Sequence, residues 1–497
     1  MEQAVQQIRF DFFPELPIVV EAQAAPMSSD TGMIVIRQFD DQIGFTERFI
    51  ACLNDPRDAK LVDHLVGQMV RQRIYGILGG YEDCNDHDTL RDDPVFKLIG
   101  GRAPNDKPLA SQPTLSRFEN QVDIPSLFRL HEFFLEDFIR SFDRPPTSIT
   151  LDIDAFDDAC HGDQQLALFH AFYEQYQYLP LVISCAETKQ ILWVCLRPGN
   201  MHSAKGADDD LREVVTRLRQ AWPDVVIRIR ADAGFGVPWM YDVCEAATGA
   251  CIDYTFGLAV NPVLKRAAEP VLQRAVEMFA QTKQPSRCFD QFFYRADTWK
   301  NLRRVIVKAE CNQLGTNLRF IVTDRAGAGL CPGAAYEEYA ERGESENRNK
   351  ELKTELCADR LSCHRFVANY FRLMLHAAAL NLLVRLRRVV ADPPELSEAG
   401  DPTAEGVSVA DPTLPVAALK DDERRRYHRR RRQRDPLGQG HIATWRTLLI
   451  KVAGEVIQSV RRILIRVPAS WPHLNWFNHV CQTIDRLRRN GSAQVAN

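Results

Sequence analysis

Five residues in the segment 339–353 have the types and spacing of a phosphate-handling site: Tyr339, Arg342, Glu346, Lys350 and Lys353. At about 100° per residue, a helix places all five within ~80° of one face. A single carboxylate then projects among cations and an aromatic ring. This suits a metal-binding acid beside a phosphate backbone, because the cations attract the phosphates while the carboxylate holds the ion. The alternative is a solvated helix face, on which Glu346 pairs with Lys350.

Two strand-like segments end in further acids. In TSITLDIDAF, apolar residues alternate with polar ones, so Asp152 and Asp154 share one face of a predicted strand. In DVVIRIRADAGFG, a similar alternation ends at Asp232, just before two glycines. A carboxylate at a strand end is held rigidly at the crevice above a sheet, where small residues let a large ligand approach. Asp154 is the favoured ligand on the first strand because it lies at the strand end, and Asp152 is the alternative.

The order of elements around these acids predicts the kind of sheet. Strands are expected at 178–186 and 190–196, joined by a short polar hairpin, and a helix is expected near 206–221. The Asp232 strand, a helix near 237–248 and a strand at 253–260 follow. This is the order of an α/β, ribonuclease-H-like mixed sheet. That fold carries its acids on the first strand, at the end of the fourth strand and on a late helix, where this chain has Asp154, Asp232 and Glu346.

The pattern Y-x2-R-x3-E-x6-K at 339–353 resembles the signature of DDE transposases encoded by bacterial insertion sequences. DIDAF, followed by His161 and Gly162, is similar to the same family, although Phe156 departs from the usual threonine. Segments 80–94 and 111–120 also resemble it, so the resemblance covers roughly 40–390. It implies a cut-and-paste transposase that hydrolyses DNA at the element's ends and joins the freed 3′-hydroxyl to target DNA, with hairpin formation on the excised end by analogy.

The same resemblance implies cofactors, partners and location. Two divalent ions about 3.5–4 Å apart serve in-line displacement at phosphorus, and oxygen ligands suit Mg²⁺, with Mn²⁺ as a substitute. The 13 cysteines contain no C-x-x-C pair and the 12 histidines no H-E-x-x-H, which disfavours zinc. The expected partners are the terminal inverted repeats and target DNA, bound by a homodimer in the synaptic complex. Unpatterned cysteines and the lack of a signal peptide favour the bacterial cytoplasm, at the nucleoid.

Composition and spacing divide the chain into predicted regions. The 114 positions from Asp232 to Glu346 exceed one connection of a minimal core and contain strand-like segments, so a β-rich insertion is expected. The apolar stretch 366–384 contains Arg372, His376 and Asn381, which predicts a buried helix and no membrane span. From 416 to the end, 17 Lys or Arg stand against 6 Asp or Glu, and 443–467 has helical spacing. The predicted regions are a helical end-binding part (1–145), the catalytic core (146–261 and 326–390), the β-rich insertion (262–325), an acidic Pro-rich linker (391–415) and a basic helical part (416–497).

Several residues outside the acids are candidates for DNA contact. Trp299 in the insertion has a ring that can stack on a displaced base, although a core tryptophan is the alternative. His202 lies in a loop after the third strand, where plain exposure to water is the alternative. The arginine-rich run at 424–434 is expected to neutralise DNA phosphates, and the alternative is that it pairs with the flanking acids. With the residues at 339–353, the candidates are Arg117, His202, Trp299, Arg303, Arg304, Arg424, Arg425, Arg426, Arg429, Arg430, Arg431 and Arg432.

Two rival functions share parts of this pattern. A metal-dependent nuclease has the same acids without strand transfer, and a ribonuclease-H-like core alone does not distinguish the two. A domesticated DNA-binding protein keeps the fold and the basic tail without turnover. The presence of all three acids favours a catalytic protein over the second rival.

Overall fold

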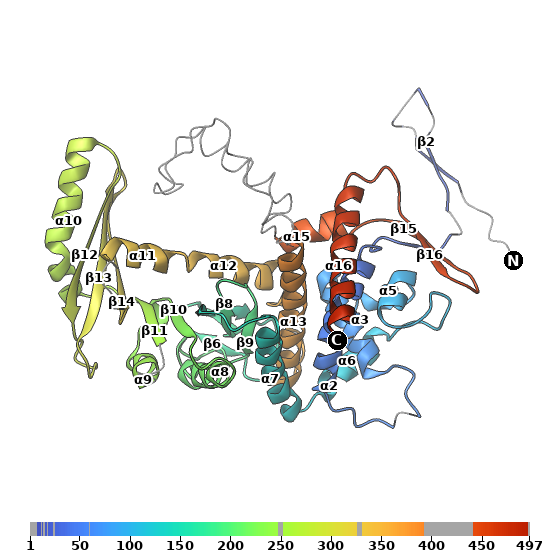
Figure 1. Cartoon of the computed structure of the whole chain (residues 1–497), viewed down its shortest axis with the longest axis horizontal. Helices are drawn as coiled ribbons and strands as arrows, with labels where there is room; N and C mark the ends of the chain where they lie inside the picture. The colour runs from blue at the N-terminus through green and yellow to red at the C-terminus, as the bar shows by residue number, and fades with distance from the viewer. Residues whose placement is uncertain are drawn as a thin grey trace.

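The computed structural model describes residues 7–495, apart from 11, 13–14, 17, 23–24, 59, 247–251, 326–330 and 392–440. Figure 1 shows an elongated molecule with three parts in a row. A helical part built from the N-terminal segments stands at one end, a sheet with its covering helices lies in the middle, and a hairpin with a long helix stands at the far end. Helix α13 (Phe366–Ala391) separates the first two parts.

The central sheet has the predicted ribonuclease-H-like order. Its eight strands run β12-β13-β14-β11-β10-β4-β8-β9, with β4, β10 and β11 parallel to one another. Strand β8 is antiparallel to both of its neighbours, β4 and β9, so β9 runs in the same direction as β4. The five core strands are β4 (Ser148–Ala155), β8 (Leu181–Cys185), β9 (Ile191–Cys195), β10 (Val226–Ala231) and β11 (Ile252–Leu258). The crossover helices are α8 (Ala207–Ala221) and α9 (Pro238–Ala246). The predicted strands and helices of this core are confirmed.

Alternation along β4 decides which face carries the acids. Ile149, Leu151 and Ile153 are buried in the same apolar cluster as Leu211 and Leu218 of α8. Because successive strand residues point to opposite faces, Asp152 and Asp154 point to the other face. Helices α11 (Pro332–Ala340) and α12 (Gly343–Lys350) lie along that side, as Figure 1 shows. The apolar pattern therefore directs both aspartates toward the helix that carries Glu346.

The segment 339–353 differs from the single regular helix expected from its spacing. Tyr339 belongs to α11 and Glu346 to α12, with a turn at Glu341 and Arg342 between them. The stretch η2 (Glu351–Glu355), which contains Lys353, is a π-helix. A π-turn has more residues per turn than an α-helix, so the regular spacing does not extend to Lys353. Its side chain instead pairs with Asp157, two residues after the end of β4.

The insertion extends the core sheet. Strand β14 pairs antiparallel with β11, with Thr323 opposite Thr255, so the insertion hairpins continue the same hydrogen-bonded ladder. Figure 1 shows the long helix α10 against the outer strands. The strands expected between 289 and 324 are present, and their ladder is shared with the core. The elements are α10 (Pro262–Thr282), β12 (Ser286–Tyr294), β13 (Arg303–Asn312) and β14 (Gly315–Thr323).

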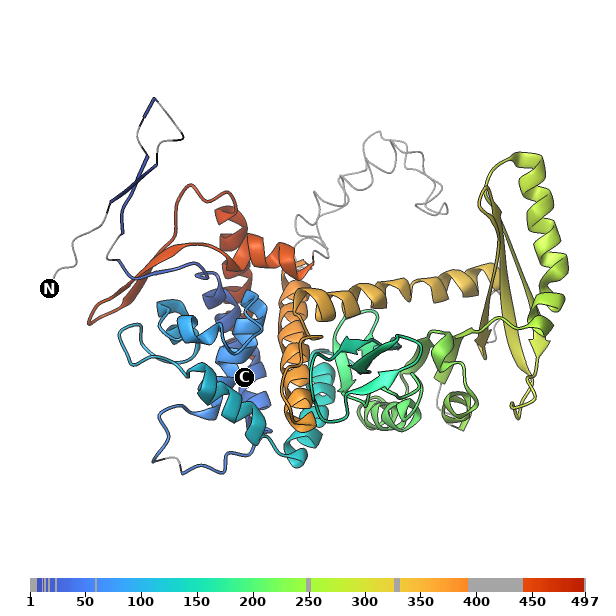
Figure 2. The same cartoon turned by 180° about the vertical axis from the view of Figure 1, so that it is seen from behind.

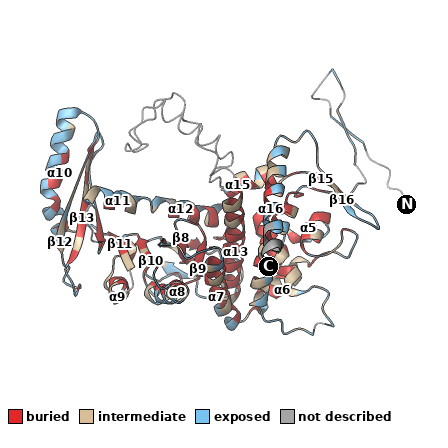
Figure 3. Cartoon of the chain, viewed as in Figure 1, coloured by how far each residue is buried: buried red, intermediate tan, exposed pale blue. Residues whose placement is uncertain are grey.

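Helix α13 packs the sheet against the N-terminal helices, and Figure 3 shows it buried along most of its length. Asn381 donates a hydrogen bond to the Ile191 carbonyl and accepts one from the Ile191 N–H, at 2.8 Å each. It therefore satisfies two backbone polar groups of the edge strand β9. By length and composition α13 is apolar enough to cross a membrane, but 89% of its apolar window is buried inside the fold. In this structure it is the predicted buried core helix.

A buried ion cluster fixes α13 to the N-terminal helices. Glu119 of α6 is 0% exposed and binds Arg73 of α3 at 2.6 Å and Arg372 of α13 at 2.7 Å. Burial alone raises the pKa of Glu119, but the two guanidinium groups lower it to about 2. The helices of this part are α1 (Met33–Ile43), α2 (Phe45–Ala51), α3 (Val66–Gly79), α4 (His87–Leu90), α5 (Pro94–Ile99), α6 (Gln112–Gln121) and α7 (Ile124–Arg140).

The helix predicted over 443–467 is wrong. A short helical stretch there gives way to the antiparallel hairpin β15–β16, and β15 also pairs with β3 near the N-terminus. Val456 and Ile465 face each other in that hairpin, so the apolar residues follow a strand period that helical spacing imitates. Gly454 is required, because a Cβ there lies 2.5 Å from Thr31 Oγ1. Figure 2 shows this hairpin beside the N-terminal part.

The C-terminal segment therefore folds onto the N-terminal part of the chain. The remaining elements at the two ends are β1 (Ile8–Phe10), β2 (Ile18–Val20), β3 (Met27–Ser28), α15 (Ile442–Trp445), the π-helix η4 (Arg446–Ile450), β15 (Gly454–Gln458), β16 (Ile463–Arg466) and α16 (Leu474–Val495). The linker predicted from 391 and the arginine run at 424–432 lie outside the described residues, apart from Ala391.

Glu119→Gln should lower the free energy of unfolding by ~3–5 kcal/mol, because it leaves two buried guanidinium groups without a counter-charge. Since the folded pKa of Glu119 is depressed, its contribution is complete above the ordinary value of 4.5 and is lost as the pH falls toward 2. Urea titrations at several pH values measure both effects. Asp55→Asn, which removes a partly exposed pair with Arg57, should cost less than ~1 kcal/mol. Equal losses for the two variants would contradict the assigned role of Glu119.

Candidate active site

Asp152 on β4 is the centre of a buried ion cluster, which lies beneath the predicted acids Asp154, Asp232 and Glu346. Its carboxylate is 1% exposed and accepts hydrogen bonds from Arg230 Nε at 2.8 Å, Arg230 Nη2 at 3.1 Å and Arg348 Nη2 at 2.7 Å. Both oxygens are therefore engaged by cations of the same fold. The alternative assignment of Asp152 as a metal ligand is not supported, because two guanidinium groups already neutralise this carboxylate and bind both of its oxygens. Asp152 instead ties together β4, β10 and α12.

Asp154, two residues further along β4, lies at the edge of the site. Asn349 Nδ2 donates to Asp154 Oδ2 at 2.9 Å, and Arg342 Nη1 lies 3.7 Å from the same oxygen. Burial, with a smaller contribution from the charges of Asp232 and Glu346, raises the pKa of Asp154 to about 6 against the lowering effect of Arg342. The three acids predicted from the sequence thus act on one another electrostatically.

Asp232 follows the last residue of β10. The parallel register pairs Arg230 with Asp152 and Ala231 with Ile153, so the next step along both strands brings Asp232 beside Asp154. Asp232 Oδ1 accepts from the Gly234 N–H at 2.8 Å and begins the 3-10 turn η1 (Ala233–Phe235). That hydrogen bond fixes one carboxylate oxygen at the mouth of the sheet.

A glycine on the neighbouring strand makes this arrangement possible. A Cβ at Gly257 of β11 lies 2.6 Å from the Ala233 nitrogen and 2.8 Å from Tyr339 Oη. Both distances are too short for a real side chain. Gly257 therefore lets the Asp232 turn and the Tyr339 ring approach β11 closely, which a larger residue prevents.

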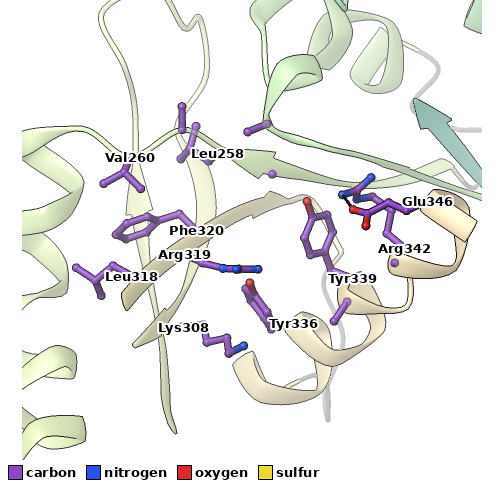
Figure 4. Close-up of a pocket in the computed structure, with 15 residues that line it drawn as sticks. Leu258, Val260, Lys308, Leu318, Arg319, Phe320, Tyr336, Tyr339, Arg342 and Glu346 are labelled. Carbon is purple, nitrogen blue, oxygen red and sulfur yellow. Dashed lines mark hydrogen bonds and ion pairs between the residues drawn. The ribbon is translucent and has the colours of Figure 1, made fainter. Parts of the chain in front are cut away.

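Glu346 projects from α12 with 67% of its side chain exposed. Arg342 Nη2 donates to Glu346 Oε1 at 3.2 Å, and the same guanidinium faces Asp154. Figure 4 shows the Arg342–Glu346 pair at the end of the pocket. Arg342 therefore offsets the charge of two crowded acids.

A cavity of about 540 Å³ adjoins the acids, between the insertion strands and the helices α11 and α12. Figure 4 shows apolar side chains on its strand side and two tyrosines from α11. Cations stand at several points of its wall. Such a mixture of rings, apolar groups and cations fits a nucleotide, whose base is flat and whose phosphate is charged. The lining residues include Lys308, Arg319, Phe320, Tyr336, Tyr339 and Arg342.

Other predicted contacts lie nearby or elsewhere. Lys353 Nζ binds Asp157 Oδ1 at 2.7 Å, and Lys350 is exposed on α12. His202 is exposed on its loop, where its Nδ1 lies 3.2 Å from the Ala204 N–H. Arg117 is on α6, in the N-terminal part, and donates to Thr114 Oγ1.

The stacking role expected for Trp299 is not supported. Its ring is 7% exposed and packs against Tyr241 and Tyr294 at 5.1 and 5.4 Å between centroids. Arg303 lies over the Tyr241 ring and binds Glu245 through two nitrogens at 2.7 and 3.0 Å. Buried, fully paired groups of this kind hold the insertion together, so we withdraw Trp299 and Arg303 as DNA contacts.

Arg304 is also engaged within the insertion. It donates to Gln291 Oε1 at 2.7 Å and to the Arg325 carbonyl at 2.8 Å. These bonds assign it to the sheet and leave its contact with DNA without support.

The sequence reasoning missed the cations that bind Asp152 and the amide that orients Asp154. Arg230 and Arg348 are 6% and 4% exposed. A signal for Arg230 was present, since it shares a strand face with Asp232 and lies between the apolar residues Ile229 and Ala231. Arg348 and Asn349 had no comparable signal, because their partners lie almost 200 positions earlier in the chain.

Among the described residues, three potential metal ligands with atoms within 4.8 Å of one another are Glu351, Glu355 and His441. Glu351 is already paired with Arg387 Nη1 at 3.0 Å. His441 Nδ1 lies 3.4 Å from Glu355 Oε1. This group joins the C-terminal segment to the end of the catalytic helix, and its pairing with Arg387 gives Glu351 a structural role.

Three carboxylates on the first strand, after the fourth strand and on a late helix of a ribonuclease-H-like sheet define an enzyme that acts on phosphodiester bonds of nucleic acid. The chain belongs to the family described as transposase DDE domain group 1, whose model matches residues 12–400. It is accordingly a DNA transposase. The family generally uses divalent metal ions, and the oxygen ligands of Asp154, Asp232 and Glu346 fit such ions.

One solved structure with detectable similarity is a cryo-EM structure of the piggyBac transposase synaptic complex with hairpin DNA. It is 13% identical, with a TM-score of 0.37, over 72% of this chain and 75% of that chain. No curated protein sequence matches the chain. The family assignment rests on the sequence model.

Asp152→Asn and Asp154→Asn should have opposite effects on stability. The first leaves Arg230 and Arg348 buried without full counter-charge, which should lower the free energy of unfolding by several kcal/mol, ~3–5. The second should raise it by ~1–3 kcal/mol at pH 7.5 without metal, because a raised folded pKa means that stability falls as the pH rises from 3.8 to about 6.

Thermal unfolding with and without millimolar Mg²⁺ measures both effects. Mg²⁺ should stabilise the wild type and Asp152→Asn, and should leave Asp154→Asn unchanged. Stabilisation of Asp154→Asn equal to that of the wild type would show that Asp154 holds no ion.

Proposed function

We propose that Asp154, Asp232 and Glu346 form the site at which this transposase cleaves the ends of a bacterial insertion sequence and joins the freed 3′-hydroxyl to target DNA. The carrying observation is the convergence of these acids above the buried layer of Asp152, Arg230 and Arg348. Crowded negative groups, of which Asp154 has a pKa raised to about 6, favour a bound cation.

Two Mg²⁺ ions, with Mn²⁺ as a substitute, are the proposed cofactor. When bound at such a site, they activate the attacking oxygen and stabilise the leaving oxygen of an in-line displacement at phosphorus. The chain supplies the positioning. Asn349 orients Asp154 through a 2.9 Å hydrogen bond, and the Gly234 N–H orients Asp232. Arg342 lies within reach of both Asp154 and Glu346 and can donate a charge-assisted hydrogen bond to the scissile phosphate.

The cavity beside the acids is the proposed seat of the terminal nucleotide. Lys308, Arg319 and Arg342 offer cations to its phosphates, and the half-buried Tyr339 offers a ring to its base. Lys350 and Lys353 continue along the catalytic helix, although Lys353 is paired with Asp157. His202 is exposed on the loop that reaches the Asp232 turn, where Ser203 approaches Gly234. These groups are proposed to hold the strand on either side of the scissile bond.

The remaining parts are proposed to recognise and pair the ends. The helical N-terminal part, with Arg117 on its surface, binds the terminal inverted repeats, and two copies of the chain hold two ends in the synaptic complex. The arginines at 424–432 add sequence-independent attraction to phosphates. The protein acts in the bacterial cytoplasm, on nucleoid DNA.

Asp154→Asn, Asp232→Asn and Glu346→Gln should each abolish cleavage and strand transfer, with losses of about 10³-fold or more, because each removes a charge that holds the ions at similar side-chain volume. The assay uses duplexes that carry the inverted repeats flanking the coding sequence, with Mg²⁺ or Mn²⁺ and a supercoiled target. Binding of the repeats should persist. Glu337→Gln, an exposed acid on α11, is the matched control and should retain activity.

Normal cleavage by the Asp232 or Glu346 variant would overturn the proposed site. Cleavage without any joined product in the wild type would identify a nuclease in place of a transposase reaction.

Arg319→Gln should weaken DNA binding and lower the slope of log affinity against log salt by about one, because one phosphate contact releases about one counterion. Arg287→Gln, on the outer strand β12 and 58% exposed, is the control because it lies outside the cavity. Fluorescence anisotropy over a salt series measures the slopes. An unchanged slope for Arg319→Gln would place the DNA elsewhere.

A further inference from the structure

An exposed aromatic hairpin lies outside every role assigned above. It consists of residues 168–176, where β6 (Leu168–His170) and β7 (Gln175–Tyr178) belong to a three-stranded sheet with β5 (Asp158–Ala159). Its side chains are unusually exposed for their types: Phe169 51%, Phe172 82%, Tyr173 37% and Tyr176 62%. Exposed apolar groups that are contiguous on a surface usually mark a binding site.

The rings of the aromatic hairpin are held in place. Phe169 stands opposite Tyr176 in the ladder, with ring centroids 5.6 Å apart. At the tip, Tyr173 packs against Phe172 at 5.1 Å and against His170 at 4.9 Å. Each ring therefore supports another while keeping one face in solvent. A surface of this kind loses little side-chain entropy when a flat ligand binds.

The back of the hairpin is packed against the loop after β9. A Cβ at Gly199 lies 1.8 Å from the Gln177 carbonyl oxygen and 2.5 Å from that of Leu168, so this loop touches both strands. The same loop continues to Ser203, which approaches Gly234 beside Asp232. This loop therefore contacts both the hairpin and the turn that follows Asp232.

A second set of contacts connects the hairpin to the catalytic helix. Gln175 donates to Asp157 Oδ2 at 3.2 Å, and Asp157 Oδ1 binds Lys353 at 2.7 Å. At the tip, the pKa of Tyr173 is raised by partial burial and by the charges of Asp157, Asp232 and Asp154. Through Asp157 and Lys353 the hairpin is joined to the helical segment that follows Glu346, and its tip lies within electrostatic reach of Asp154 and Asp232.

We propose that the aromatic hairpin stacks on unpaired bases of the DNA strand next to the scissile phosphate. This inference rests on the proposed function, since it requires DNA at the acids. The hairpin has no lysine or arginine and carries Glu174, so attraction to phosphates does not explain it. Every base offers a flat face to an aromatic ring, but only a base outside the duplex stack exposes that face. The hairpin thus selects opened DNA at the point of reaction.

The test compares two fluorescein-labelled probes in Ca²⁺ buffer: a blunt-ended duplex extended by a tail of six thymidines, and the same duplex with a tail of six abasic sites. Both tails carry the same phosphates, so their difference reports stacking. The wild type should bind the thymidine tail about tenfold more tightly (~1.4 kcal/mol). Phe172→Ala and Tyr176→Ala should each remove most of this preference, and Phe172→Trp should keep it.

Phe293→Ala is the matched control, because Phe293 is 69% exposed on the outer strand β12 and belongs to the insertion. It should retain the preference. Equal binding of the two tails by the wild type would overturn the proposal. It would also be overturned if Phe172→Ala weakened binding of the blunt duplex, the thymidine tail and the abasic tail by the same factor. A lower sedimentation mass of the free Phe172→Ala protein would also overturn it, and would assign the hairpin to contact with a second copy of the chain.

The outcomes are separable from those of the proposed catalytic site. The tail preference is a binding difference that involves no cleavage. An active Asp232→Asn variant would overturn the catalytic assignment without changing that preference. Equal binding of the two tails by the wild type would overturn the hairpin proposal without changing the outcome of the Asp232→Asn cleavage assay.

Discussion

The arrangement of the active site depends on the neutralisation of one buried aspartate. Asp152 on β4 binds Arg230 on β10 and Arg348 on α12, so a single carboxylate joins the three elements that carry the catalytic candidates. Each partner lies two residues from an acid: Asp152 from Asp154, Arg230 from Asp232, and Arg348 from Glu346. A buried charge without a partner is costly, so this layer strongly specifies how strand and helix meet. The acids above it are positioned because the layer beneath them cannot be rearranged cheaply.

The upper layer shows the opposite balance. Asp154, Asp232 and Glu346 repel one another, and Arg342 provides the main compensation in the protein alone. The chain thus places a satisfied ion cluster next to an unsatisfied one. Local violations of good electrostatics are characteristic of functional sites, where the missing charge is supplied by a ligand. Stability comes from the lower layer, and affinity for cations and phosphates comes from the upper one.

The sequence predicted the core well because the core obeys simple periods. Alternation in β4 and β10 identified both strands and the face of their acids, and the hairpin between β8 and β9 followed from a short polar break. The failures have physical causes. Segment 443–467 forms strands although its apolar residues also satisfy a helical period, because pairing with β3 across most of the chain length decides the outcome. Asp152 needed partners 78 and 196 positions away. The aromatic hairpin escaped notice because its rings are exposed, and burial is what periodicity detects.

The contacts of Glu351 hold together the residues that flank positions 392–440. Arg387, near the end of α13, and His441, at the start of the C-terminal segment, both approach the Glu351 carboxylate. The flanking residues are therefore anchored at one place, beside the catalytic helix. Insertions or deletions between two such fixed points change the entropy of chain closure only slightly, so the number of residues between positions 391 and 441 can vary at small cost.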